Sequence, residues 1–168
     1  HVLESFKEYL PFKLTKSQNL VIDEINEDLN QIKPMRRLVQ GDVGSGKTIV
    51  AAAAMLSVAK NNFQTVLLCP TEVLAEQHFK NFSLWMKNKD LDIALLTGKT
   101  KKNEWEKINK GLISGKTKIL IGTHSVFQER VSLKNLALVV VDEQQRFGVK
   151  QRFEILQKTA KGIMPHQL

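Results

Sequence analysis

The sequence predicts a three-layer α/β fold with a mostly parallel central sheet, and two patterns carry this prediction. Short strands rich in β-branched and aliphatic residues alternate with longer segments of helical periodicity. The strands are apolar on both faces, which is typical of parallel strands that right-handed crossovers cover with helices on each side. A chain of 168 residues has the length of one ordinary domain, so we expect a single domain over residues 1–168.

The first predicted helix begins after Thr15. Thr15 and Gln18 have the spacing of a capping box, in which each side chain bonds the backbone N–H of the other residue. Apolar residues then recur at steps of three and four, and Pro34 ends the helix. The residues expected on its buried face are Ile22, Ile25, Leu29 and Ile32.

The other elements follow in strict alternation. They are a strand at 38–39, a glycine loop, a helix over 48–60, a strand over 65–69, a helix that continues to 86, a strand over 93–96, a Lys-rich helix centred on Trp105 and Ile108, a strand over 118–121, a helical turn around Val126 and Phe127, and a strand over 136–141. Residues 163–168 turn apolar again, which indicates a further strand in a longer protein.

Composition excludes several classes of protein. Apolar residues make up 42% and charged residues 25%, as in globular domains and unlike disordered chains. The longest nearly apolar run, 49–59, is too short to span a bilayer, and no secretory signal opens the chain. Cys69 is the only cysteine and cannot form an intrachain disulfide, which fits a reducing compartment. We therefore expect a cytoplasmic protein without a membrane partner.

Net charge indicates a polyanionic partner without proving one. Lys and Arg number 25 against 17 Asp and Glu, a formal charge of +8. Seven lysines lie between Lys99 and Lys118, against Glu104 and Glu106. Their spacing favours a solvated helix face over a dedicated nucleic-acid surface.

Residues 41–48 match the phosphate-binding pattern G-x-x-x-x-G-K-[ST] between a strand and a helix. Glycines let backbone N–H groups approach phosphate oxygens, and the helix N-terminus adds partial positive charge. Lys47 would neutralise the β- and γ-phosphates, and the Thr48 hydroxyl would bind Mg²⁺. A loop that merely turns a strand into a helix is the alternative. The predicted nucleotide-binding residues are Gly41, Asp42, Val43, Gly44, Ser45, Gly46, Lys47 and Thr48.

Two acids directly follow the strand over 136–141. Asp142 stands at the carboxyl end of that strand, where open α/β sheets bind ligands, and would complete the Mg²⁺ site. Glu143 would polarise the attacking water as a general base. Alone, such a pair also fits loop solvation; together with the phosphate loop it favours catalysis.

Six strings resemble the DExx-box helicases of superfamily 2, and specifically the RecG family of branch-migrating DNA helicases. They occur in that family's order at residues 10–18, 40–48, 69–78, 96–98, 121–124 and 142–149, and span Leu10 to Arg152. Transcription-repair coupling translocases share several of these strings and are the alternative within the same class.

The resemblance implies a RecA-like first motor domain from a bacterial, monomeric, ATP- and Mg²⁺-dependent helicase that acts on branched DNA in recombination and repair. Lys47 and Glu143 are then the catalytic residues, and Gln18 reads the adenine. Leu10, Pro11 and Phe12 would pack on the base. The second motor domain, with its arginine fingers, the TAT-type motif and the DNA-wedge domain are expected outside this chain.

Segments at three strand ends resemble the motifs that hold the DNA backbone in this family. Short hydroxyls and backbone N–H groups suit sequence-independent phosphate contacts. Taken singly, each segment also fits a strand-terminating turn. The residues are Pro70, Thr71, Thr97, Gly98, Gly122, Thr123 and His124.

One residue departs from the family pattern. Gln145 stands where the family usually has His, which leaves the coupling of ATP and DNA sites open. We expect His78, Phe79 and Trp85 to be structural, and Arg146 and Arg152 not to be arginine fingers, because a finger comes from across the cleft.

A nucleotide-controlled switch of the GTPase type is the main alternative from another class. It requires an Asn-Lys-x-Asp signature, and residues 88–90 are one residue short of it. A small-molecule kinase would need an arginine-rich lid, which five scattered arginines do not supply.

Overall fold

The computed structural model describes residues 13–29, 47–87, 90–123, 131–142 and 166–167. Its strands form one sheet in the order β2-β3-β1-β4-β5. Every neighbouring pair is parallel, which confirms the predicted α/β class. The strands are β1 (Gln64–Leu68), β2 (Asp92–Leu96), β3 (Thr117–Gly122), β4 (Leu136–Val141) and β5 (His166–Gln167).

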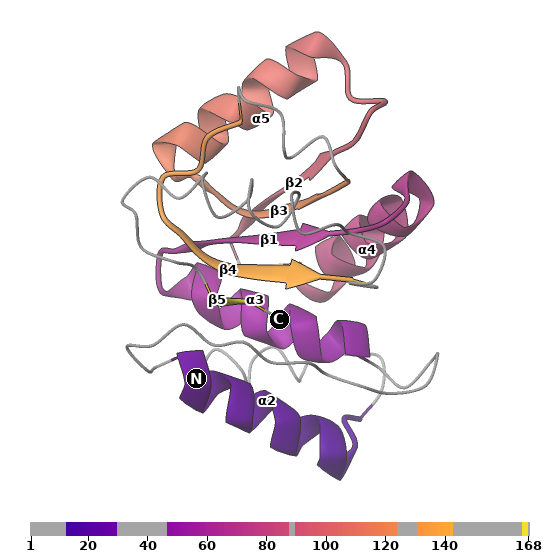
Figure 1. Cartoon of the computed structure of the whole chain (residues 1–168), viewed down its shortest axis with the longest axis vertical. Helices are drawn as coiled ribbons and strands as arrows, with labels where there is room; N and C mark the ends of the chain where they lie inside the picture. Colours follow the sequence, from indigo (N-terminus) through magenta and orange to yellow (C-terminus); the bar gives the residue numbers. More distant parts are fainter. Residues whose placement is uncertain (1–12, 30–46, 88–89, 124–130, 143–165, 168) are drawn as a thin grey trace.

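Helices cover both faces of the sheet, as the apolar strands require (Figure 1). Because side chains alternate along a strand, Leu67 of β1 packs in the core with α3, whereas Val66 and Leu68 pack in the core with α5. The predicted three-layer arrangement is therefore confirmed. The helices are α2 (Lys16–Leu29), α3 (Lys47–Lys60), α4 (Glu72–Trp85) and α5 (Lys102–Ser114).

Helix α3 is the most deeply buried helix among those described. Ten of its residues are buried, four of them consecutive alanines at 51–54, whose small side chains let the helix lie close to the sheet. It packs against β1 and β4 on one side and against α2 on the other. Its start is therefore held firmly relative to the strand ends.

The start of α2 and the end of α5 both carry local sequence signals. The predicted capping box forms: Gln18 donates its backbone N–H to Thr15 Oγ1 at 3.1 Å, and Thr15 donates its backbone N–H to Gln18 Oε1 at 2.8 Å. Helix α5 ends at Gly115, whose φ of 80° is the left-handed conformation that glycine adopts without strain. The predicted strand at 38–39 and the turn at 126–127 lie outside the described residues.

A buried glutamine ties three elements together at the amino end of the sheet. Gln64 Nε2 donates to the carbonyl oxygens of Leu112, at 2.8 Å, and Thr117, at 2.9 Å. Its Oε1 accepts the backbone N–H of Asn135 at 2.9 Å. One side chain thus joins the end of α5 to the approaches of β3 and β4.

Trp85 belongs to the core, as expected, and its ring centroid lies 6.0 Å from that of Phe82. The helices that the structure describes include none long and apolar enough to cross a membrane.

Candidate nucleotide and DNA site

The carboxyl ends of β1, β2, β3 and β4 are joined by three backbone hydrogen bonds. The Asp142 N–H donates to Leu68 at 2.9 Å, and the Cys69 N–H donates to Gly122 at 2.9 Å. The Thr123 N–H donates to Leu96 at 3.3 Å. The predicted metal carboxylate and the three predicted DNA segments therefore share one edge of the sheet.

The start of α3 faces the same edge. This helix has 14 residues, a length of about 20 Å, and β1 begins only a few residues after it ends. Lys60, the last residue of α3, thus lies near the amino end of β1. Because α3 packs along β1, its first residues, Lys47 and Thr48, lie toward the carboxyl end of β1. Lys47 is exposed and Thr48 is half-buried, so both are open to a ligand at the helix N-terminus.

Several predicted site residues lie outside the described parts of the chain. They are Gly41, Asp42, Val43, Gly44, Ser45, Gly46, His124 and Glu143. Arg146 and Arg152 lie outside these parts as well.

Asp142 presents a partly exposed carboxylate at the end of β4. Its side chain is 34% exposed, and Oδ2 lies 3.0 Å from Nε2 of His78 on α4. A carboxylate and the Thr48 hydroxyl are hard oxygen donors, the kind that Mg²⁺ prefers. Within the described ranges no three His, Cys, Asp or Glu side chains cluster as a metal cage.

Cys69 lies beside this carboxylate but is chemically inert. Burial, and secondarily the negative charge of Asp142, raise the pKa of the Cys69 thiol to about 12. The thiolate is the nucleophilic form, and it does not form at neutral pH in this environment. Cys69, His78 and Asp142 therefore do not work as a cysteine-hydrolase triad.

The first of the three predicted DNA segments caps a helix. Thr71 is the N-cap of α4, and its Oγ1 accepts the Leu74 N–H at 3.2 Å. The residue is exposed, so its hydroxyl hydrogen can still be donated to a phosphate oxygen. Pro70, directly before it, is half-buried.

The second segment, at the end of β2, is a tight turn. Thr97 is buried, and its Oγ1 accepts the Lys99 N–H at 3.2 Å, so this hydroxyl shapes the turn. Gly98 is exposed and lies close to α4: a Cβ at this position would meet Glu72 Oε1 at 2.9 Å. Lys99 also pairs with Glu72, at 3.6 Å.

The third segment ends β3. Gly122 and Thr123 are both buried, and Thr123 Oγ1 has no hydrogen-bond partner among the residues described. An unpaired buried hydroxyl is costly, which suits a group that gains its partner on ligand binding.

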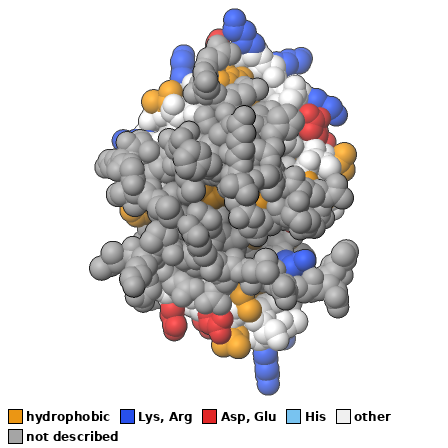
Figure 2. All heavy atoms as spheres, in the orientation of Figure 1, with side chains coloured by type: hydrophobic (Ala, Val, Ile, Leu, Met, Phe, Trp, Pro, Cys, Tyr) orange, Lys and Arg blue, Asp and Glu red, His pale blue; other side chains and the backbone are white. Residues whose placement is uncertain are grey.

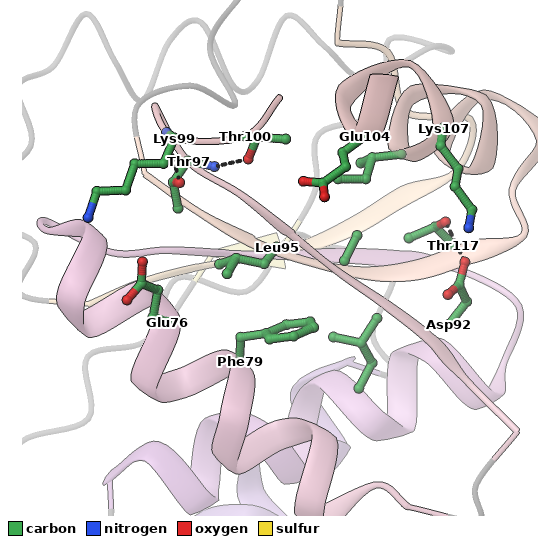
Figure 3. Close-up of a pocket in the computed structure, with 13 residues that line it drawn as sticks. Glu76, Phe79, Asp92, Leu95, Thr97, Lys99, Thr100, Glu104, Lys107 and Thr117 are labelled. Atoms are coloured by element: carbon green, nitrogen blue, oxygen red, sulfur yellow. Dashed lines mark hydrogen bonds between the residues drawn. The ribbon is translucent and has the colours of Figure 1, made fainter. Parts of the chain in front are cut away.

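A groove of about 450 Å³ runs along the outer side of β2, between α4 and α5 (Figure 3). Thr97 and Lys99 lie toward one end, and Asp92 and Thr117 toward the other. The wall of this groove contains two lysines of the stretch between Lys99 and Lys118, namely Lys99 and Lys107. Blue side chains project at the end of the molecule where α5 lies (Figure 2). The lysines of α5 are exposed, as expected for a solvated helix face.

The contacts of Gln18 and His78 bear on the roles that the sequence indicates for them. Gln18 is used in the capping box, so its role as adenine reader remains a prediction. His78, which the sequence indicated as structural, contacts Asp142, the carboxylate predicted to bind the metal. The available signal was the string at 69–78, which resembles the helicase motif and ends on this histidine.

A parallel sheet whose carboxyl edge holds the start of a buried helix and a strand-end carboxylate defines a RecA-like domain. A family model described as DEAD/DEAH box helicase matches residues 13–167, and the chain belongs to that family.

One relative, the ATP-dependent DNA helicase RecG of Synechocystis, is 48% identical over 167 residues, which cover 99% of this chain and 20% of the relative. The chain thus spans about a fifth of that protein's length. A structure of RecG bound to a three-way DNA junction superposes with a TM-score of 0.86 at 44% identity, over 98% of this chain and 22% of that one. A structure of Dbp5 from S. cerevisiae, 18% identical with a TM-score of 0.71, covers 99% of this chain and 44% of that one and shows the fold alone.

Proposed function

We propose that this chain is the ATP-binding first motor domain of a RecG-type DNA helicase that belongs to a longer, cytoplasmic, monomeric bacterial protein. That protein would act on branched DNA, in fork reversal and Holliday-junction branch migration. The observation that carries the proposal is the shared sheet edge, where Asp142 and the strand ends that lead into the three DNA segments are hydrogen-bonded in series. The second motor domain and the wedge domain would lie outside residues 1–168.

The residues at this edge have separate tasks in ATP binding. Lys47 neutralises the β- and γ-phosphates, while Thr48 and Asp142 hold Mg²⁺, which supplies charge neutralisation to the phosphates when bound. Glu143 accepts the proton of the attacking water. The glycines of residues 41–46 surround the phosphates, and Gln18 reads the adenine after leaving its cap.

DNA binding uses the backbone and is independent of sequence. Exposed Thr71 and Gly98 offer a hydroxyl and an N–H at strand ends, where a phosphate can approach. The buried Thr97 hydroxyl holds its turn in shape, whereas the buried Thr123 hydroxyl, which has no partner among the described residues, gains one when DNA binds. Pro70, Gly122 and His124 complete the set. Because three backbone hydrogen bonds link Asp142 to the end of β1, then to the end of β3 and then to the end of β2, a change at the ATP site reaches these turns over a few hydrogen bonds.

Two variants of the longer protein test the assignment. Lys47→Ala should abolish nucleotide binding, because it removes the charge that holds the phosphates. Glu143→Gln should keep binding and reduce hydrolysis by about 10²–10⁴-fold, because the carboxylate acts only on water. Equal loss of ATP binding in the two variants would overturn these roles.

Nucleotide choice separates the motor from a GTPase-type switch. The motor predicts that ATP competes for the site better than GTP, since residues 88–90 lack a complete guanine signature. Preferential GTP binding by the chain would favour the switch. The RecG relatives favour RecG over a transcription-repair coupling translocase as the parent protein.

A further inference from the structure

Among the described residues, the His78 side chain makes one hydrogen bond, and its partner is the predicted metal carboxylate. The residue is 8% exposed, and Nε2 lies 3.0 Å from Asp142 Oδ2. Nδ1 is buried without a hydrogen-bond partner among the described residues. Since an ionised carboxylate only accepts hydrogen bonds, His78 donates its Nε2–H to Asp142.

A purely structural role explains this arrangement poorly. Among the described residues Nδ1 has no partner, and burying an imidazole nitrogen in this way costs free energy that a leucine at this position would avoid. Donation to a metal-binding carboxylate does explain it, because such outer partners fix the orientation of the ligand and its remaining oxygen.

His78 also stands on the helix that begins at the first DNA segment. It follows Thr71 by seven residues, two helical turns or about 10 Å along α4, and therefore lies near the same face of the helix. A displacement of the helix start is thus carried to the Nε2–Oδ2 contact.

We propose that His78 is a positioning residue: it orients Asp142 for Mg²⁺ and couples the DNA contact at Thr71 to that carboxylate. The inference rests on the proposed function, in which Asp142 is the Mg²⁺ carboxylate.

The decisive experiment measures how much Mg²⁺ tightens the binding of a fluorescent ADP analogue to the chain. His78→Leu removes the donor and retains an apolar side chain of similar bulk. We expect it to lower Mg²⁺ affinity by about 10-fold or more, with metal-free nucleotide affinity unchanged. His78→Gln, which carries an amide donor, should restore most of the Mg²⁺ effect. Gln77→Leu, at the neighbouring exposed position of α4, is the matched control and should bind like wild type.

Stability and spectroscopy give independent readouts. His78→Leu should unfold at the same or a higher temperature than wild type, although it loses the Mg²⁺ effect. In wild type, ¹⁵N NMR should show a protonated Nε2 whose resonance moves with Mg·ADP and not with metal-free ADP. The His78→Gln spectrum assigns this resonance among the four histidines. An unmoved resonance would overturn the proposal even if the leucine variant failed to fold.

The coupling is measured by adding a saturating oligodeoxynucleotide. It should change the Kd of the Mg·nucleotide in wild type, and this change should disappear in His78→Leu. An equal change in both proteins would overturn the coupling, and an unaltered Mg²⁺ effect in His78→Leu would overturn the positioning role alone. A wild-type chain that binds no nucleotide would instead overturn the proposed function, and this inference with it.

Discussion

The backbone N–H of Asp142 donates a 2.9 Å hydrogen bond to the carbonyl oxygen of Leu68. This bond fixes the end of β4 beside the end of β1, and the chain after Leu68 continues through Pro70 into the Thr71 cap of α4. The predicted metal carboxylate and the first predicted DNA contact are therefore neighbours in space, although about 70 residues separate them in the sequence.

Replacing Gln64 should destabilise the domain strongly. Gln64→Leu leaves two buried carbonyl oxygens and one backbone N–H without their present partner, so we expect a loss of about 2–4 kcal/mol in the free energy of unfolding. Urea denaturation measures this change. Gln77→Leu, on the exposed side of α4, should stay within about 0.5 kcal/mol of wild type. If Gln64→Leu lowered the free energy of unfolding by no more than about 0.5 kcal/mol, water would have replaced the lost hydrogen bonds.

Cys69 should resist thiol reagents in the folded chain. Its pKa is raised from 9.0 to about 12, so the folded thiol stays neutral at pH 9 and above while the unfolded thiol ionises. Three pKa units correspond to about 10³-fold less thiolate, and burial adds a steric barrier. Labelling at pH 9 with and without urea measures the difference. Because Cys69 is the only cysteine of the chain, no other thiol contributes to the labelling signal. Equal labelling rates with and without urea would show that Cys69 is not buried.

The same raised pKa sets the sign of a pH effect on stability. The folded state holds the thiol proton more tightly, so the contribution of Cys69 is fully present below pH 9 and is lost as pH rises toward 12. Cys69→Ala should remove that part of the alkaline destabilisation.

DNA binding by the chain should be weak, independent of sequence and dependent on salt. With about three or four phosphates contacted, log K should fall with log salt at a slope of about −2 to −3 for single strands. Fluorescence anisotropy at several salt concentrations measures the slope. A salt-independent affinity or a preferred base sequence would contradict the backbone contacts.

Substitutions at Thr71 separate helix capping from phosphate binding. Thr71→Ser keeps both functions and should bind DNA like wild type. Thr71→Asp keeps the cap, because aspartate is a good N-cap residue, but places a negative charge against the phosphate and should weaken binding. Equal affinities of the two variants would remove Thr71 from the DNA contacts.

The isolated chain should bind Mg·ATP but hydrolyse it barely above background. An arginine finger from a second domain contributes about 10³–10⁵ in rate, more than the remaining groups can replace. Steady-state ATPase assays with and without a DNA fork test this expectation. Strong DNA-stimulated turnover by residues 1–168 would place the finger within the chain, with Arg146 and Arg152 as the first residues to substitute.

The sequence by itself determined the elements and the location of the site. The apolar run at 136–141 became β4 with the same bounds, and the spacing of Thr15 and Gln18 produced the capping box. Hydrophobic periodicity and capping act between residues a few positions apart, so their signals can be found locally. The prediction that Asp142 lies at the ligand-binding edge of the sheet likewise followed from the rule that open α/β sheets bind ligands at the carboxyl ends of their strands.

Only the tertiary structure decided which side chains meet. The order β2-β3-β1-β4-β5 brings His78 to Asp142, 64 residues away. It also buries Thr97 and Thr123, which the motifs alone predicted as DNA contacts. Such contacts depend on the packing of α4 and the strands against one another. A histidine on a helix has the same local pattern whether it faces another core residue or a metal carboxylate, and the packed sheet edge is what distinguishes the two.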